Sequence, residues 1–194
     1  MREIAHNVLD AIDGFVRGFL ENAGKGLNNW IEMFGDETFW KSLGIALRFT
    51  LMILPSTLIL SLCTAVLISR IKNDFMAAVY RVVAYMPVVL PTTVAMLVWA
   101  KLYDVKFGYL NIMLQNLGVN SPPNWLGSPK WALTAMVVPT VWSQFGYWTL
   151  LFLIGIYNIN AEVYEASLVD GANGWQQLWY MTIPLLKPVF TLVL

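Results

Sequence analysis

Long runs without a charged residue dominate the pattern of this chain and predict helices that cross a membrane. Three such runs hold twenty, nineteen and thirty-one residues, at positions 49–68, 82–100 and 131–161. A transmembrane helix needs about 20 residues at about 1.5 Å rise each. None of the runs alternates with the period of two that a membrane strand requires. We therefore expect three nearly complete transmembrane helices, at about 43–70, 79–103 and 131–158.

A fourth apolar run begins at Val189 and is still incomplete at Leu194. A free carboxylate at mid-membrane depth is costly, so we expect this helix to continue beyond Leu194. Each of the three complete runs also contains proline, which removes a backbone donor and favours a kink. Neighbouring helices can satisfy the freed carbonyls in a membrane bundle. The prolines concerned are Pro55, Pro87, Pro91 and Pro139.

Residues 1–38 contain no spanning run and predict a separate amphipathic segment. Its apolar residues recur at helical spacing, which is typical of a helix that lies on a membrane face or on a partner. The members of this apolar stripe are Ile4, Val8, Ile12, Phe15 and Phe19. Residues 1–42 hold seven acids and four bases, whereas residues 43–194 hold five acids and eight bases. We therefore expect two parts, an amino-terminal segment at 1–38 and a transmembrane domain at 39–194.

The composition agrees with a membrane solvent. Only 12% of the residues are charged and 58% are hydrophobic, whereas soluble domains carry about a quarter charged residues. The net charge is zero, so no basic surface argues for nucleic acid. The single cysteine, Cys63, lies in an apolar run and the single histidine, His6, has no nearby ligand set. We expect no metal site, and we interpret Cys63 as core packing.

The density of basic residues predicts the orientation of the spans. The loop from Arg70 to Arg81 holds three bases in twelve residues, whereas Lys101 to Lys130 holds three in thirty. Cytoplasmic loops are enriched in Lys and Arg. The first loop is therefore predicted to be cytoplasmic, and two spans later the chain after Ala161 returns to the same side.

The segment 159–184 predicts two short helices with a sharp joint. Asn160 can cap the first helix, and Gly171 can supply the left-handed position that follows its end. Asn173 can cap the second helix, with Gln176 as the reciprocal partner. Pro184 is expected to break that helix before the chain enters the membrane again.

Two interpretations of this segment follow from the residues alone. A compact knob between two spans could dock in a cleft of a cytoplasmic partner. Alternatively, it is a connecting loop whose Trp175 and Trp179 anchor at the level of the lipid headgroups.

A resemblance favours the docking interpretation. Glu165-Ala166-Ser167, three residues, Gly171, nine residues and then Met181-Thr182-Ile183-Pro184 closely resembles the "EAA" signature of ABC importer permeases. Ser167 replaces the third alanine of that pattern, and Met181 and Ile183 replace Ile and Leu. The context Tyr164-Glu165 and Asp170-Gly171-Ala172 is similar to the carbohydrate branch. Further likenesses to that branch run along the chain after residue 38, at Phe39-Trp40-Lys41, Arg81, Pro87, Pro91, Trp99, Gly108, Asn111 and Asn124-Trp125-Leu126.

The resemblance implies an all-α, polytopic membrane protein with part of the type I ABC importer permease fold, in the cytoplasmic membrane of a bacterium or archaeon. It implies that segment 159–184 is the cytoplasmic coupling loop that sits in a groove of an ATPase subunit. ATP and Mg would act on that subunit, so this chain would be neither an enzyme nor a cofactor carrier. The other implied partners are a second permease subunit, forming a heterodimer, and an extracytoplasmic solute-binding protein. The implied coupling residues are Glu165, Ala166, Ser167, Asp170, Gly171, Ala172 and Pro184.

Polar residues in the third run mark a possible contact with the solute. Thr140, Ser143, Gln144 and Tyr147 are spaced at i, i+3, i+4 and i+7 and share one helix face. A buried amide in lipid is costly, so this face should look into the bundle or a wet cavity. The face could line a sugar path or hold helices together by hydrogen bonds. A second stripe in the first run is interpreted as packing: Thr50, Thr57, Ser61 and Thr64.

We expect a sugar importer permease, with a permease for another solute, such as an amino acid or a polyamine, as the alternative. An ion-driven carrier would need acidic residues inside the membrane, and none of the three runs contains one. A membrane enzyme is also disfavoured, because no intramembrane histidine cluster, carboxylate pair or nucleophile constellation occurs.

Overall fold

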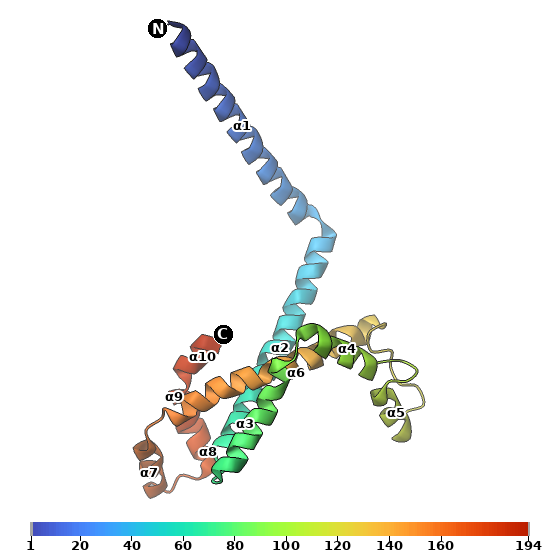
Figure 1. Cartoon of the computed structure of the whole chain (residues 1–194), viewed down its shortest axis with the longest axis vertical. Helices are drawn as coiled ribbons and strands as arrows, with labels where there is room; N and C mark the ends of the chain where they lie inside the picture. The colour runs from blue at the N-terminus through green and yellow to red at the C-terminus, as the bar shows by residue number, and fades with distance from the viewer. Residues whose placement is uncertain (1, 194) are drawn as a thin grey trace. The chain divides into compact units, whose positions relative to one another are not determined.

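The structure is a computed structural model that consists of helices and connecting turns (Figure 1). It describes residues 2–193, without the side chains of 2–13, 15, 19, 21, 23, 27 and 193. The helices are α1 (Arg2–Gly35), α2 (Glu37–Ser69), α3 (Asp74–Val89), α4 (Thr92–Leu102), α5 (Tyr109–Asn116), α6 (Pro129–Tyr157), α7 (Ala161–Val169), α8 (Gly174–Gln177), the π-helix η1 (Leu178–Thr182), α9 (Ile183–Leu185) and α10 (Lys187–Val193).

The chain divides into two compact units, Met1–Arg48 and Phe49–Leu194. In the first unit, α1 ends at Gly35 and Asp36 starts the next helix by accepting a 2.7 Å hydrogen bond from the Thr38 N–H. The Trp40 indole closes the joint with a 2.8 Å hydrogen bond to the Phe34 carbonyl. The amino-terminal segment is helical, as expected. The side chains of the apolar stripe (Ile4, Val8, Ile12, Phe15 and Phe19) lie outside the described ones, so the amphipathic segment 1–38 remains a prediction.

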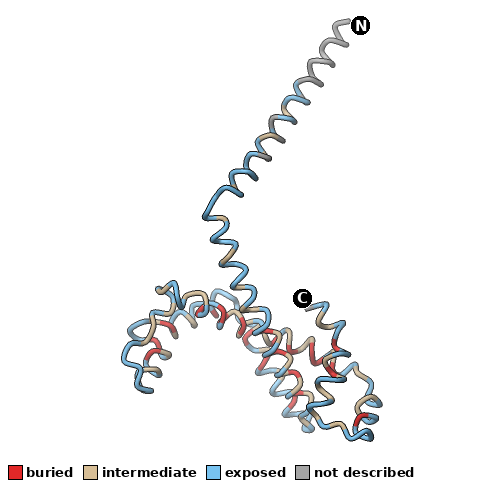
Figure 2. Tube along the Cα trace, turned by 180° about the vertical axis from the view of Figure 1, so that it is seen from behind, coloured by how far each residue is buried: buried red, intermediate tan, exposed pale blue. Residues whose placement is uncertain are grey.

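The second unit has its core where α2, α3 and α6 meet α9 and α10. The buried members of this core are Ala65, Ile68, Ala77, Phe152, Leu153, Ile156 and Leu186. Figure 2 shows buried positions, in red, recurring along the tube of this unit. The opposite sides of the helices carry exposed apolar residues such as Leu51, Ile59 and Val82, which is the arrangement expected of helices surrounded by lipid. Cys63 of α2 is also exposed, so the expectation that it packs in the core is wrong.

Small and hydroxyl residues let α6 approach its neighbours closely. A Cβ added to Gly146 would collide with the Ala84 carbonyl of α3, so the two backbones touch there. From α2, the Ser61 hydroxyl donates a 2.9 Å hydrogen bond to the Phe145 carbonyl. Thr149 donates to the same carbonyl at 2.7 Å. Membrane helices commonly pack through such small residues and interhelical hydrogen bonds. Ser61 confirms the packing interpretation at its own position, whereas Thr50 and Thr57 of the same stripe line a cavity.

The three predicted spans are present as helices, but the second is not continuous. By length and composition, α2 and α6 can each cross a membrane, and α3 with α4 makes a third candidate span that is bent by 94°. The bend falls at Leu90 and Pro91, whose ψ angles are both 132°. A residue before proline avoids the helical region, so the expectation of one helix over 79–103 is wrong at this point.

A cluster of hydrogen-bonded polar and aromatic residues lies between α4 and α6. Asn111 is buried and donates to the carbonyls of Asp104 and Val105, while it accepts 2.7 Å from the Trp125 indole. Hydrogen bonds from the N–H groups of Phe107 and Lys106 lower the pKa of the Asp104 carboxyl. This segment is therefore an ordered turn that sets the start of α6.

Replacing Gly146 with valine should destabilise the second unit, because the side chain would separate α6 from α3. Overpacking of this kind costs about 3 kcal/mol when the backbone must move. Gly44→Val is the matched control, because a Cβ at Gly44 meets nothing within 4 Å. Thermal unfolding of the full-length protein in detergent measures both variants. Equal melting temperatures for the two variants would contradict the close packing at Gly146.

Candidate functional site

The segment after α6 forms the predicted pair of helices, α7 and α8. Asn160 caps α7, since its side-chain oxygen accepts a 3.1 Å hydrogen bond from the Glu162 N–H. Its amide nitrogen lies 3.0 Å from the Glu162 carboxylate. An acidic residue in the first turn of a helix is also favoured by the helix dipole. The predicted start of the first helix is therefore confirmed.

Gly171 forms the joint between the two helices. Its φ angle is 77°, in the left-handed region that glycine adopts without strain. The N–H of Ala172 bonds to the Ser167 carbonyl at 2.9 Å, and that of Gly171 to the Leu168 carbonyl at 3.1 Å. These two bonds make a Schellman motif, which satisfies the carbonyls at the end of α7. The predicted left-handed joint is confirmed.

The second helix starts as predicted but does not stop at Pro184. Asn173 and Gln176 form the reciprocal capping box, with bonds of 2.9 Å and 2.8 Å. Beyond α8 the backbone widens into η1, where the Ile183 N–H bonds to the Leu178 carbonyl five residues back. This wider turn accommodates a proline ring that would clash in a regular α-helix. The chain turns at Leu186 instead, so the expected break at Pro184 is wrong.

The predicted coupling residues divide between the surface and the interior of the loop. Glu165, Ala166, Asp170 and Gly171 are exposed, Ala172 is half-buried and Pro184 is exposed. Ser167 is the exception, with 1% of its surface exposed. The loop also exposes large apolar side chains, foremost Val169 at 88%. An exposed apolar patch rimmed by polar residues marks an interaction surface. Its other members are Leu168, Trp175, Trp179 and Tyr180.

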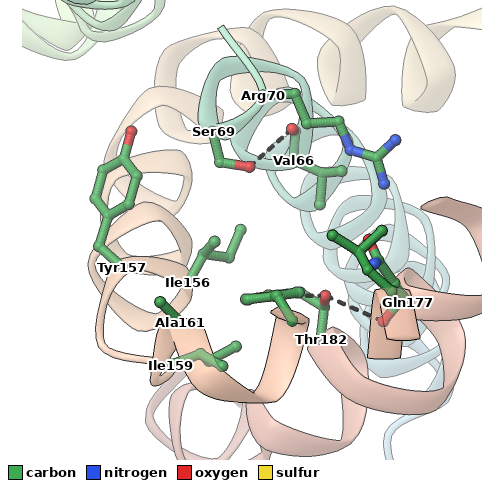
Figure 3. Close-up of a pocket in the computed structure, with 11 residues that line it drawn as sticks. Val66, Ser69, Arg70, Ile156, Tyr157, Ile159, Ala161, Gln177 and Thr182 are labelled. Carbon is green, nitrogen blue, oxygen red and sulfur yellow. Dashed lines mark hydrogen bonds between the residues drawn. The ribbon is translucent and has the colours of Figure 1, made fainter. Parts of the chain in front are cut away.

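A cavity of about 360 Å³ lies between the loop and the ends of α2 and α6 (Figure 3). Arg70, at the end of α2, reaches across and donates a 2.7 Å hydrogen bond to the Gly174 carbonyl. Sequence reasoning missed this contact, because 104 residues separate the two partners. It also missed Tyr164, Gln177 and Thr182, whose side chains bond inside the loop.

The polar face of α6 is split by the structure. Thr140 and Gln144 line a cavity of about 390 Å³ against α2, together with Thr57 and Trp148. Ser143 is half-buried and Tyr147 is exposed, and neither lines this cavity. Within the described part of the chain, the Gln144 amide makes no hydrogen bond, so it is available to a further group.

The Thr140 and Ser143 hydroxyls on this face are already used as donors. Thr140 donates to the Met136 carbonyl and Ser143 to the Pro139 carbonyl, each at 2.8 Å. Their oxygens can still accept a hydrogen bond. Among the residues described, no group of three or more His, Cys, Asp or Glu could hold a metal ion.

The comparison with known families decides the assignment. Residues 57–194 match the family described as "Binding-protein-dependent transport system inner membrane component". The chain belongs to this family. Its members are transport components of the inner membrane, so the predictions of a permease, a multi-pass membrane protein and a non-catalytic chain are confirmed.

Individual relatives of this permease are carbohydrate transport proteins by name. The chain is 35% identical over 170 residues to the trehalose/maltose transport system permease protein MalF of Thermococcus litoralis, covering 87% of this chain and 56% of that protein. It is 30% identical over 171 residues to the diacetylchitobiose uptake system permease protein NgcF of Streptomyces coelicolor, covering 84% and 48%. The chain thus spans about half the length of these relatives.

A solved structure confirms the fold of this permease. A chain of a bacterial ABC transporter involved in the import of the acidic polysaccharide alginate matches with a TM-score of 0.78 and 21% identity. The match covers 84% of this chain and 57% of that one. The expected all-α permease fold is therefore confirmed.

Asn173→Ala should loosen the second helix of the loop in this permease. Loss of an N-cap side chain costs about 1 kcal/mol. We expect faster amide hydrogen exchange over residues 174–182, measured by mass spectrometry on the full-length protein. Gln176→Ala is the control that removes only the reciprocal bond and should have the smaller effect. Unchanged exchange in Asn173→Ala would mean that the cap does not hold this helix.

Proposed function

We propose that this chain is a permease subunit of an ABC importer for a sugar, and that its loop 159–184 couples solute movement to a separate ATPase. One observation carries the proposal: the EAA residues form a capped two-helix knob whose outer surface exposes Glu165 and an apolar patch. Exposed apolar groups rimmed by polar residues are typical of an interaction surface, and we take the adjacent Glu165 carboxylate to favour a protein partner.

The proposed partner is an ATPase subunit with a groove for the knob. Val169 and Leu168 would bury their side chains in that groove, and Glu165 would meet a basic or hydrogen-bonding group at its edge. Movement of the knob then acts on α6, which ends only a few residues before α7. A second permease subunit and a solute-binding protein would complete the importer.

The names of the relatives support a sugar as the solute. Trehalose, maltose and diacetylchitobiose appear in them, and the solved structure belongs to an importer of a polysaccharide. We therefore favour a sugar over an amino acid or a polyamine. A cationic polyamine would also call for acidic residues along the path, and α6 contains none.

The proposed sugar path follows the face of Thr140, Ser143, Gln144 and Tyr147. Gln144 offers donors and an acceptor that suit sugar hydroxyls, and Trp148 beside it offers an apolar ring surface. Their cavity of about 390 Å³ is within the usual range of small-molecule sites, about 300–1,000 Å³.

Gly171→Val tests the coupling role. A β-branched side chain cannot readily take a positive φ, so the joint should distort while the spans stay folded. We expect loss of solute-stimulated ATP hydrolysis in the reconstituted transporter. Gly171→Asn is the matched control, because asparagine tolerates the left-handed region, and it should keep most of the stimulation. Wild-type stimulation in Gly171→Val would remove the loop from the coupling mechanism.

Gln144→Leu tests the sugar path. Loss of a hydrogen bond to a buried sugar hydroxyl costs about 1–3 kcal/mol, or roughly 5- to 150-fold in affinity. Uptake should fall when it is normalised to assembled complex. Thr64→Val, a polar-to-apolar change in α2 away from this cavity, is the control and should transport normally. Full normalised uptake with poor assembly in Gln144→Leu would assign this face to helix packing.

A further inference from the structure

Four residues of the loop form a closed series of hydrogen bonds, which we name the loop circuit: Tyr164, Ser167, Gln177 and Thr182. The Tyr164 hydroxyl lies 3.0 Å from the Thr182 hydroxyl, which donates to the Gln177 carbonyl at 3.2 Å. The Gln177 side-chain amide donates to the Ser167 hydroxyl at 2.9 Å. Ser167 closes the series by donating to the Tyr164 carbonyl at 2.6 Å.

The circuit has only one consistent direction. The Thr182 hydroxyl has one proton, which it donates to the Gln177 carbonyl. Tyr164 is therefore the donor in its bond to Thr182. The Ser167 hydroxyl donates to the Tyr164 carbonyl and therefore accepts from the Gln177 side-chain amide. Both Thr182 and Ser167 thus donate and accept at once. Ser167 is 1% exposed, so water cannot readily replace its lost partner, whereas Thr182 borders the cavity of about 360 Å³.

The circuit joins parts of the loop that the backbone connects only through Gly171. Tyr164 and Ser167 belong to α7, whereas Gln177 ends α8 and Thr182 ends η1. A Cβ at Gly171 would meet nothing within 4 Å, so no packing fixes the angle at the joint itself. The side-chain bonds across the loop therefore restrain the angle between its two arms in addition to the two backbone bonds of the Schellman motif.

A further contact fastens the circuit to the membrane helices. Arg70 donates to the Gly174 carbonyl, at the first residue of α8. Gln177 and Thr182 line the same cavity as Arg70, and Figure 3 shows their bond facing that cavity. The second arm of the loop is thus held by α2 on one side and by α7 on the other.

We propose that the Ser167–Gln177 bond, within the loop circuit, locks the two arms of the loop into one rigid unit, so that displacement of α7 is passed to η1 and α10. This inference rests on the proposed coupling function of the loop. Ser167 and Gln177 act as positioning residues rather than as contacts of the ATPase. The serine that departs from the EAA pattern supplies the hydroxyl on which the lock depends.

The test is a double-mutant cycle in the complete transporter, reconstituted with its ATPase, second permease subunit and binding protein. Ser167→Ala, Gln177→Leu and the double variant are compared by the number of ATP molecules hydrolysed per solute imported. A single lost bond of about 1 kcal/mol should raise this ratio about fivefold. The double variant should be no worse than either single one, because both remove the same bond.

Co-purification with the ATPase shows whether a variant still assembles. A bond inside the loop leaves its outer surface intact, so both variants should bind the ATPase as the wild type does. Tyr164→Phe is a second variant should Ser167→Ala fail to assemble. It keeps the ring, removes only the donor to Thr182 and should also raise the ratio.

Two outcomes overturn different claims. A wild-type ratio in Ser167→Ala and Gln177→Leu, or effects of the two that simply add, would overturn the lock. If Gly171→Val still loses stimulation, the proposed coupling function survives that result. Wild-type coupling in Gly171→Val would instead overturn the proposed function itself, and the lock with it.

Discussion

The close approach of α6 to α3 and α2 is the contact on which the second unit depends. At Gly146 the α6 backbone touches the Ala84 carbonyl, and one residue earlier the Phe145 carbonyl receives the Ser61 hydroxyl. Lipid gives no hydrophobic reward for bringing two membrane helices together, so short contacts and buried hydrogen bonds must supply the attraction. Because α6 leads directly into α7, the same contact sets where the loop begins.

Local rules made the loop predictable from its residues. The caps at Asn160 and Asn173 depend on side chains within three residues of the backbone that they satisfy. The left-handed Gly171 depends on the absence of a side chain. The apolar runs predicted α2 and α6 for an equally simple reason, since length and lack of charge are what a bilayer selects. The proposed roles of these residues in coupling and transport remain predictions.

Features that depend on distant partners could not be predicted in the same way. The 94° bend at Pro91 exceeds the kink that a proline alone implies. The π-helix η1, which ends just before Pro184, has no sequence signature. Arg70 and Gly174 meet across 104 residues, and Tyr164 and Thr182 across 18. Such pairs become visible only when the helices have been packed.

The central claim is that the outer surface of the loop meets an ATPase, and a photo-crosslinker placed at Val169 in the complete transporter tests it most directly. Val169 is the most exposed apolar side chain of the loop, so replacing it with a benzophenone amino acid leaves the loop interior intact. The account predicts a covalent product with the ATPase subunit from this position. A crosslinker at the exposed Leu117, in the loop that follows α5, should give no such product. Absence of the ATPase product from position 169, in a transporter that hydrolyses ATP normally, would contradict the account.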